Sequence, residues 1–188
     1  MERLKKVIIA CLIMLIGLLP VTACNRSNQD KSSRDQGTRT EVSREPLDIK
    51  RITYLVYCGG QPDVQMYIIN YDLKVEKYSI RPEYDKAYDF FAGELPPEDL
   101  YEVTEFEISE QDWSSMVNVL TRVNFMELKE DMSTKDIVDD GSSYYIRVET
   151  TDAVNNSGGY VAGYDDDPEN RRFAEAKDLI NGIVWNAG

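Results

Sequence analysis

The chain contains no histidine among its 188 residues, and this absence excludes several kinds of active site. Ser-His-Asp and Cys-His catalysis need an imidazole base, and many zinc sites need a histidine ligand. Common phosphate-binding, dinucleotide-binding and serine-nucleophile motifs are also missing: Gly-x-x-x-x-Gly-Lys, Gly-x-Gly-x-x-Gly, Gly-x-Ser-x-Gly and Ser-x-x-Lys. The sequence therefore assigns no catalytic residue and no cofactor.

Long apolar runs are also scarce, and the run from Val7 to Leu19 is shorter than the roughly 20 residues that a spanning helix needs. Pro20, which interrupts helices, follows this run. The residues before the run are basic and favour the cytoplasmic side of a membrane: Arg3, Lys5 and Lys6. After Pro20 come an aliphatic residue, two small residues and a cysteine, Val21-Thr22-Ala23-Cys24. This arrangement resembles the lipobox signal peptide of bacterial lipoproteins.

The resemblance implies a lipid anchor on Cys24. In that family diacylglycerol joins the cysteine sulfur, further acylation such as palmitate completes the anchor, and the signal peptide is cut between Ala23 and Cys24. Two or more acyl chains on one cysteine hold a protein stably on a membrane. The resemblance places the domain on the outer face of the cytoplasmic membrane, or on the outer membrane of a cell that has two. An uncleaved signal anchor, or ordinary secretion after cleavage near Ala23, are the alternatives.

Cysteine is too rare for a cysteine-rich metal site, since the other two cysteines are Cys11 and Cys58. Cys11 would leave with the leader and Cys24 would carry lipid, so the mature protein could form no intrachain disulfide. Cys58 ends the run Arg51–Cys58, which is typical of a buried strand. A buried, unreactive thiol is therefore the prediction.

Residues 24–48 contain few apolar side chains and are predicted to be a disordered tether behind the lipidated cysteine. The chain carries 34 acidic and 21 basic residues, a net charge of −13. Without residues 1–23 the net charge is −15, and because the tether has five residues of each sign, residues 49–188 carry all of it. Such a domain repels nucleic acid and anionic headgroups, so nucleic acid is excluded as a partner.

Residues 49–188 are predicted to form a single α+β domain, with a mainly antiparallel sheet of about five to six strands packed by two helices. Short tight connections between the first three runs indicate antiparallel pairing. Gly59–Asp63 and Asn155–Gly159 have turn composition. The predicted strands are 52–58, 64–71, 75–80, 103–108, 143–151 and 160–164.

Two helices are predicted from caps and apolar spacing. Ser109 is expected to cap the first, whose apolar stripe recurs at three-and-four spacing: Trp113, Met116, Val117, Leu120 and Val123. Asp166 or Asp167 is expected to cap the second, with Pro168 in the early position that helices tolerate. Its buried face is predicted to be Phe173, Ala176, Ile180, Ile183 and Val184.

The most unusual stretch is 81–108, where aromatic and acidic residues alternate around Pro96-Pro97. Long connections of this kind are often functional or disordered. Phe90 and Phe91 could pack at the edge of the core, or the stretch could bind a peptide, a glycan or a cationic ligand. The candidate binding residues are Tyr84, Tyr88, Phe90, Phe91 and Tyr101.

Two acidic clusters were considered as calcium sites, and no metal ligand is assigned from either. The loop around Gly141 fails the EF-hand pattern, because Arg147 stands where a bidentate glutamate belongs. Asp165-Asp166-Asp167 is more simply a cluster at the start of a helix.

The sequence therefore predicts a membrane-anchored lipoprotein with a non-catalytic binding or interaction domain, whose partner would be an envelope protein, a peptide or a glycan. A small carboxylate-dependent envelope hydrolase is the alternative, because a glycosidase needs only two suitably spaced carboxylates. A structural subunit of a larger envelope complex is a third interpretation.

Overall fold

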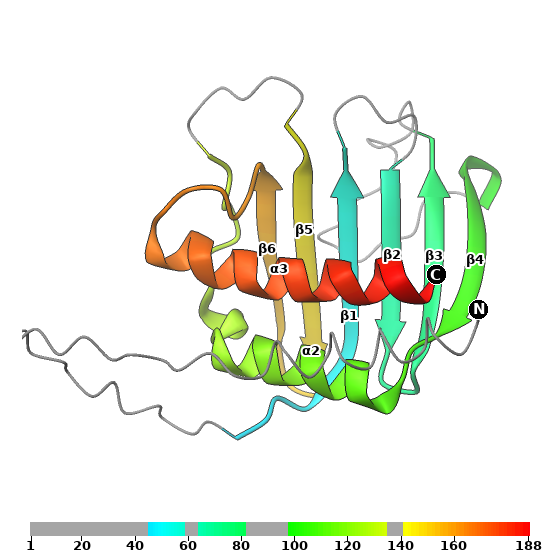
Figure 1. The fold of residues 1–188 in the computed structure, drawn as a ribbon, viewed down its shortest axis with the longest axis horizontal. Helices are drawn as coiled ribbons and strands as arrows, with labels where there is room; N and C mark the ends of the chain where they lie inside the picture. Colours follow the sequence, from blue (N-terminus) through cyan, green and yellow to red (C-terminus); the bar gives the residue numbers. More distant parts are fainter. Residues whose placement is uncertain (1–44, 59–63, 82–97, 135–140) are drawn as a thin grey trace, which may run out of the picture. The chain divides into compact units, whose positions relative to one another are not determined.

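The computed structural model describes residues 45–58, 64–81, 98–134 and 141–188, and these form six strands and two α-helices. The strands make one antiparallel sheet in the order β4-β3-β2-β1-β5-β6 (Figure 1). They are β1 (Ile49–Tyr57), β2 (Val64–Asn70), β3 (Lys74–Ile80), β4 (Tyr101–Glu107), β5 (Ser143–Thr150) and β6 (Val154–Tyr160). The predicted single α+β domain, with a mainly antiparallel sheet of about five to six strands packed by two helices, is confirmed.

The first three strands form the predicted antiparallel meander. Their β-branched and aromatic residues favour extended backbone, and β1 and β3 both pair with β2. The turn between β2 and β3 is tight, with the Leu73 N–H donating to Asn70 O at 3.0 Å. Leu73 has a φ of 73°, a left-handed conformation that a residue with a side chain adopts only where its surroundings require it.

Helix α2 (Glu110–Arg122) begins at the predicted cap, Ser109. The Ser109 Oγ accepts from the Asp112 N–H at 3.1 Å, and the Asp112 carboxylate accepts from the Ser109 N–H at 3.3 Å, a reciprocal capping box. The predicted stripe packs toward the sheet, although Trp113 and Val117 are only partly buried and Val119 is buried as well. A short 3₁₀ turn, η3 (Phe125–Glu127), follows the helix.

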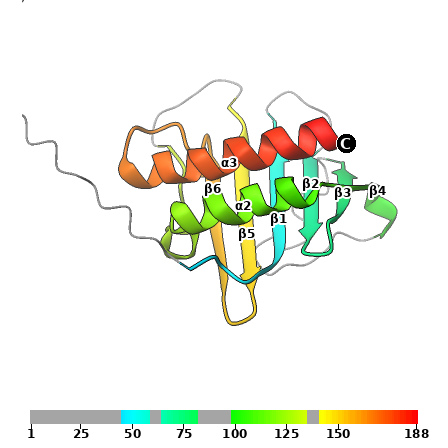
Figure 2. The ribbon, with the colours of Figure 1, turned by 60° about the horizontal axis from the view of Figure 1, so that its bottom comes forward.

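Helix α3 (Pro168–Ala187) begins after Asp167, which is the second of the two predicted caps. Its buried residues include most of the predicted face: Phe173, Ala176, Ile180 and Val184. The two helices lie side by side on the same face of the sheet (Figure 2). α3 crosses the sheet toward β4, where Gly188 comes close to the ring of Phe106.

The main core lies between the helices and the sheet. Its largest fully buried side chains are Tyr54, Tyr67, Phe125 and Phe173, and burying an apolar side chain of this kind stabilises a protein by about 1.5–3 kcal/mol. The buried Tyr54 hydroxyl donates to Asn181 Oδ1 at 3.2 Å. Burial raises the pKa of Tyr54, so the hydroxyl keeps its proton as a donor.

A second apolar cluster lies on the opposite face of the sheet, which we call the open face because α2 and α3 lie on the other side. Six buried side chains from β1, β2 and β3 form it, with Tyr101 and Tyr145 packed against them: Leu55, Val64, Met66, Ile68, Tyr78 and Ile80. The sheet therefore has an apolar centre on both faces.

The prediction was wrong at the last hairpin. Asn155–Gly159, predicted to be a turn, lies inside β6, and the predicted strand 160–164 is mostly turn. The connection between β5 and β6 is instead made at Thr151–Ala153, where the Thr150 N–H donates to Ala153 O at 2.9 Å. The glycines of this stretch let neighbouring segments of the chain lie close together.

Within the described ranges, no helix combines the length and the apolar character that crossing a bilayer requires. The leader with Cys24, the tether up to residue 44, the predicted turn Gly59–Asp63 and residues 82–97 lie outside the described residues. Predictions that fall on them stay predictions.

Candidate interaction surface at the β4 edge

The candidate binding residues of the aromatic and acidic stretch meet the described structure only at Tyr101. Tyr84, Tyr88, Phe90 and Phe91 lie outside the described residues. Tyr101 is the first residue of β4 and directly follows a 3₁₀ turn, η2 (Glu98–Leu100). Its ring meets Tyr78 edge to face, with the ring centroids 4.9 Å apart. Tyr101 therefore joins β4 to the apolar cluster of the open face.

Tyr78 fixes the position at which Tyr101 packs. It is only 5% exposed, and its hydroxyl donates to the Glu76 carboxylate at 2.5 Å. Burial and this hydrogen bond raise the pKa of Tyr78, so the phenol stays neutral and remains a donor. A neutral, hydrogen-bonded Tyr78 gives Tyr101 a rigid partner, but offers no group for acid–base chemistry near neutral pH.

Beyond Tyr101, β4 is exposed and acidic. Five of its residues are exposed, and three of these are glutamates: Glu102, Val103, Thr104, Glu105 and Glu107. Val103 is 50% exposed although it lies in the middle of a strand. None of the three glutamates forms an ion pair with a residue of the described ranges. Glu105 also faces Glu76 across the β3–β4 pair, which concentrates negative charge.

The backbone of β4 is hydrogen-bonded on one side only. The Ile108 N–H donates to Leu73 O at 3.0 Å, and hydrogen-bonded pairs alternate along an antiparallel ladder. Glu102, Thr104 and Phe106 therefore bond to β3. The N–H and C=O groups of Val103 and Glu105 point away from the sheet, where no strand of the described structure follows β4. We call this row of backbone groups and exposed side chains the β4 edge.

The opposite edge of the sheet, at β6, is covered by residues 130–134. The Gly158 N–H donates to Glu130 O at 2.9 Å, and the Met132 N–H donates back to Gly158 O at 2.8 Å. The Thr134 N–H then donates to Tyr160 O at 3.0 Å. These bonds use the outward N–H and C=O of Gly158 and the C=O of Tyr160, so the second half of β6 is covered.

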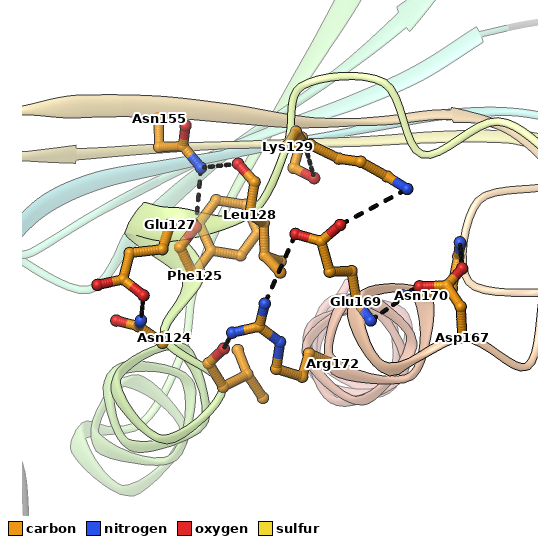
Figure 3. Close-up of polar contacts among 12 residues, drawn as sticks. Asn124, Phe125, Glu127, Leu128, Lys129, Asn155, Asp167, Glu169, Asn170 and Arg172 are labelled. Atoms are coloured by element: carbon orange, nitrogen blue, oxygen red, sulfur yellow. Dashed lines mark hydrogen bonds and ion pairs between the residues drawn. The ribbon is translucent and has the colours of Figure 1, made fainter.

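Side chains hold this covering segment in place (Figure 3). The Asn155 Nδ2 donates to Phe125 O at 2.8 Å and to Leu128 O at 3.2 Å, which ties the turn after α2 to β6. From α3, Arg172 donates to Val123 O at 3.2 Å and Glu169 pairs with Lys129 at 3.6 Å. The β6 edge is therefore built into the fold, in contrast to the β4 edge.

The acidic cluster before α3 is occupied by structural contacts. Asp165 accepts from the Thr134 hydroxyl at 2.7 Å, Asp166 pairs with Arg171 at 3.0 Å, and Asp167 caps the helix. No group of three potential ligands gathers within the described residues. The loop that includes Asp136, Asp139 and Asp140 lies outside them.

Among the carboxyls of the described residues, three have a shifted pKa, and all three are shifted downward. Hydrogen bonds from Asn170 lower the pKa of Asp167, the Ser133 N–H and hydroxyl lower that of Asp131, and Lys50 with Thr151 lowers that of Asp48. A lowered pKa keeps a carboxylate ionised at neutral pH. These three groups therefore suit structural hydrogen bonding and do not suit the proton donation that a glycosidase acid performs.

Cys58 is half-buried and packs against the main core just after β1. This is close to the predicted environment, although the thiol is not fully buried.

The features that define the β4 edge were only partly accessible to sequence reasoning. The strand at 103–108 was predicted, but nothing local in its sequence shows that it lies at the border of the sheet. The border position follows from long-range pairing, so Glu102, Val103, Glu105 and Glu107 were not identified as candidates.

Neither the protein-family models nor the curated proteins compared with this chain match it.

Proposed function

We propose that this chain is a membrane-anchored, extracytoplasmic lipoprotein whose domain is a non-catalytic interaction module. Lipid on Cys24 would attach it to the membrane, and residues 25–44 would hold the domain away from the bilayer, because Leu47 and Asp48 of the predicted tether contact the folded domain instead. The partner would be a protein, a peptide or a glycan of the cell envelope.

The observation that carries the interaction function is the exposed β4 edge. A long sheet edge with open backbone groups invites pairing with another chain, and proteins usually shorten, bend or cover such edges. Here the β6 edge is covered by Glu130–Thr134, whereas β4 pairs in regular register with β3 over all seven residues and stays exposed.

Site-specific photo-crosslinking in the full-length, membrane-bound protein tests the interaction function. Val103 on β4 and Val154 on β6 are matched positions, because both are 50% exposed valines on border strands of the same sheet. A photoreactive amino acid at position 103 is expected to give a covalent adduct with an envelope component. The same residue at position 154 should give much less. Absence of adducts at both positions, or equal adducts at both, would contradict the proposal.

The anchor is tested by Cys24→Ala. The wild-type chain should incorporate radiolabelled palmitate and sediment with membranes, whereas the variant should lose the label and keep an uncut leader, because both steps require the cysteine. Palmitate labelling that survives Cys24→Ala would contradict the lipoprotein assignment. Cys58→Ala serves as the control, because Cys58 packs against the folded core and should not carry lipid.

A further inference from the structure

We infer that the β4 edge binds an extended, basic polypeptide segment, which adds to the sheet as a seventh strand. This inference rests on the proposed interaction function and specifies its partner class and binding mode. In strand addition, backbone hydrogen bonds supply affinity, and alternate side chains supply specificity.

The backbone of β4 is suited to strand addition. The outward N–H and C=O groups of Val103 and Glu105 belong to one continuous strand, and its pairing with β3 shows no shift in register. β4 contains no proline, which would remove a donor, and no bulge, which would bend the edge away. Each outward group is therefore positioned for a ladder bond.

The side chains of β4 select the charge of the added strand. Successive residues of a strand point to opposite faces, so Val103, Glu105 and Glu107 lie on the open face together with Tyr101, and Glu102 lies on the helix side. Glu105 and Glu107 are two residues apart on one face. An added strand with lysine or arginine at two alternate positions would place both cations beside these carboxylates, and opposite charges on neighbouring strands stabilise the pair.

The same charges disfavour a second copy of this chain as the occupant. Pairing β4 with β4 of another molecule would bring six glutamates into one interface. It would also join two domains that each carry a charge of −15. The negative charge of β4 repels a second acidic copy and attracts a basic segment, and charged interfaces gain specificity in this way.

The test measures, by fluorescence anisotropy, the binding of two short fluorescent peptides to the full-length protein. One peptide alternates lysine with threonine, and the other alternates glutamate with threonine. The lysine peptide is expected to bind, and its affinity should fall as the salt concentration rises, because salt screens exposed charges. Equal binding of both peptides would overturn the inference.

Proline variants distinguish strand addition from simple charge attraction. Val103→Pro removes an outward N–H and leaves the bonds to β3 intact, a position at which border strands tolerate proline. Val103→Pro should lower the affinity for the lysine peptide by about tenfold. Val154→Pro is the matched control, since the Val154 N–H also points outward, and it should leave binding unchanged. Lysine-peptide binding that Val103→Pro does not alter would overturn strand addition.

A charge variant gives a second readout that leaves the backbone unchanged. Replacing Glu102, Glu105 and Glu107 with glutamine should lower the affinity for the lysine peptide and make that affinity less dependent on salt. Neutralising Glu130, Asp152 and Asp178 removes the same charge elsewhere on the domain and should have little effect. Equal losses of lysine-peptide affinity in the two variants would overturn the inference that the partner is basic. A β4-mediated dimer of the wild-type protein in sedimentation would overturn it as well.

The two proposals can fail separately. If crosslinking succeeds at position 103 and the lysine peptide does not bind, the partner class is wrong and the interaction function stands. If crosslinking fails at both positions, the interaction function itself is wrong.

Discussion

A buried asparagine, Asn170, and the partly exposed Asp167 fix the junction between β6 and α3. Asn170 is 2% exposed, and its Oδ1 accepts from the Gly163 N–H at 2.9 Å while its Nδ2 donates to the Asp167 carboxylate. Asp167 also accepts from the Glu169 N–H at 2.9 Å as the helix cap. Buried polar groups require such partners, so Asp167, which belongs to the aspartate cluster considered as a calcium site, serves as a hydrogen-bond partner of Asn170.

The pKa of Asp167 makes this junction sensitive to acid. Hydrogen bonds from Asn170 lower that pKa below its usual value of 3.8, so the ionised carboxylate stabilises the folded state above that pH. This contribution is lost as the pH falls through the lowered, folded-state pKa. Asp167→Asn should therefore lower the urea midpoint at neutral pH, and the difference from wild type should shrink in acid well below pH 3.8.

Asp152→Asn is the control for this titration, because Asp152 lies exposed in the turn between β5 and β6. It should leave the pH dependence of unfolding close to that of wild type. A midpoint difference for Asp167→Asn that stays constant across the pH range would show that the cap contributes no titrating stability.

At the scale of elements, two glycines of β6 allow neighbouring segments of the chain to lie close to this strand. A Cβ on Gly158 would lie 2.2 Å from Tyr144 O, and one on Gly159 would lie 2.2 Å from the Ser133 Oγ. Glycine inside a strand often marks such an approach. Gly158 therefore lets β6 lie close to β5, and Gly159 lets residues 130–134 lie close to β6.

Gly158→Ala should consequently destabilise the domain by about 2–3 kcal/mol, because the added methyl group meets the backbone of β5. Gly182→Ala is the matched control, since nothing lies within 4 Å of its would-be Cβ in helix α3. It should stabilise the domain by about 0.5–1 kcal/mol. Denaturant unfolding of both variants gives the two free energies of unfolding, and changes of the same sign would contradict the role assigned to Gly158.

Local signals in the sequence were sufficient for most elements. Ser109, Asp167 and the apolar spacing located both helices, and the β-branched runs located β1, β2 and β3. These features act between residues close in sequence, so they can be read without the fold. The overall class followed from them.

The sequence was misleading where long-range contacts decide the structure. Asn155–Gly159 has the composition of a turn, but pairing with β5 on one side and Glu130–Thr134 on the other draws it into a strand. The candidate site was predicted in part for the same reason. Tyr101 was identified, whereas the border position of Glu105 and Val103 depends on which strand comes last in the sheet.

At the scale of the whole molecule, the sheet has one edge that is closed by its own chain and one that is protected mainly by charge. Residues 130–134 hydrogen-bond to Gly158 and Tyr160 along the outward side of β6. At β4, three glutamates are the feature that opposes pairing with another copy. A net charge of −15 on residues 49–188 adds to this repulsion and favours solubility.

This difference predicts how the whole molecule responds when the charge is removed. Replacing Glu102, Glu105 and Glu107 with threonine keeps strand propensity and removes the repulsion, so the β4 edges of two molecules should pair. We expect concentration-dependent self-association in sedimentation velocity, with wild type remaining monomeric under the same conditions. Neutralising Glu130, Asp152 and Asp178 changes the net charge equally and should leave the domain monomeric. If both variants associate alike, total charge rather than the β4 glutamates governs solubility; if the threonine variant stays monomeric, the β4 edge is not a competent pairing surface.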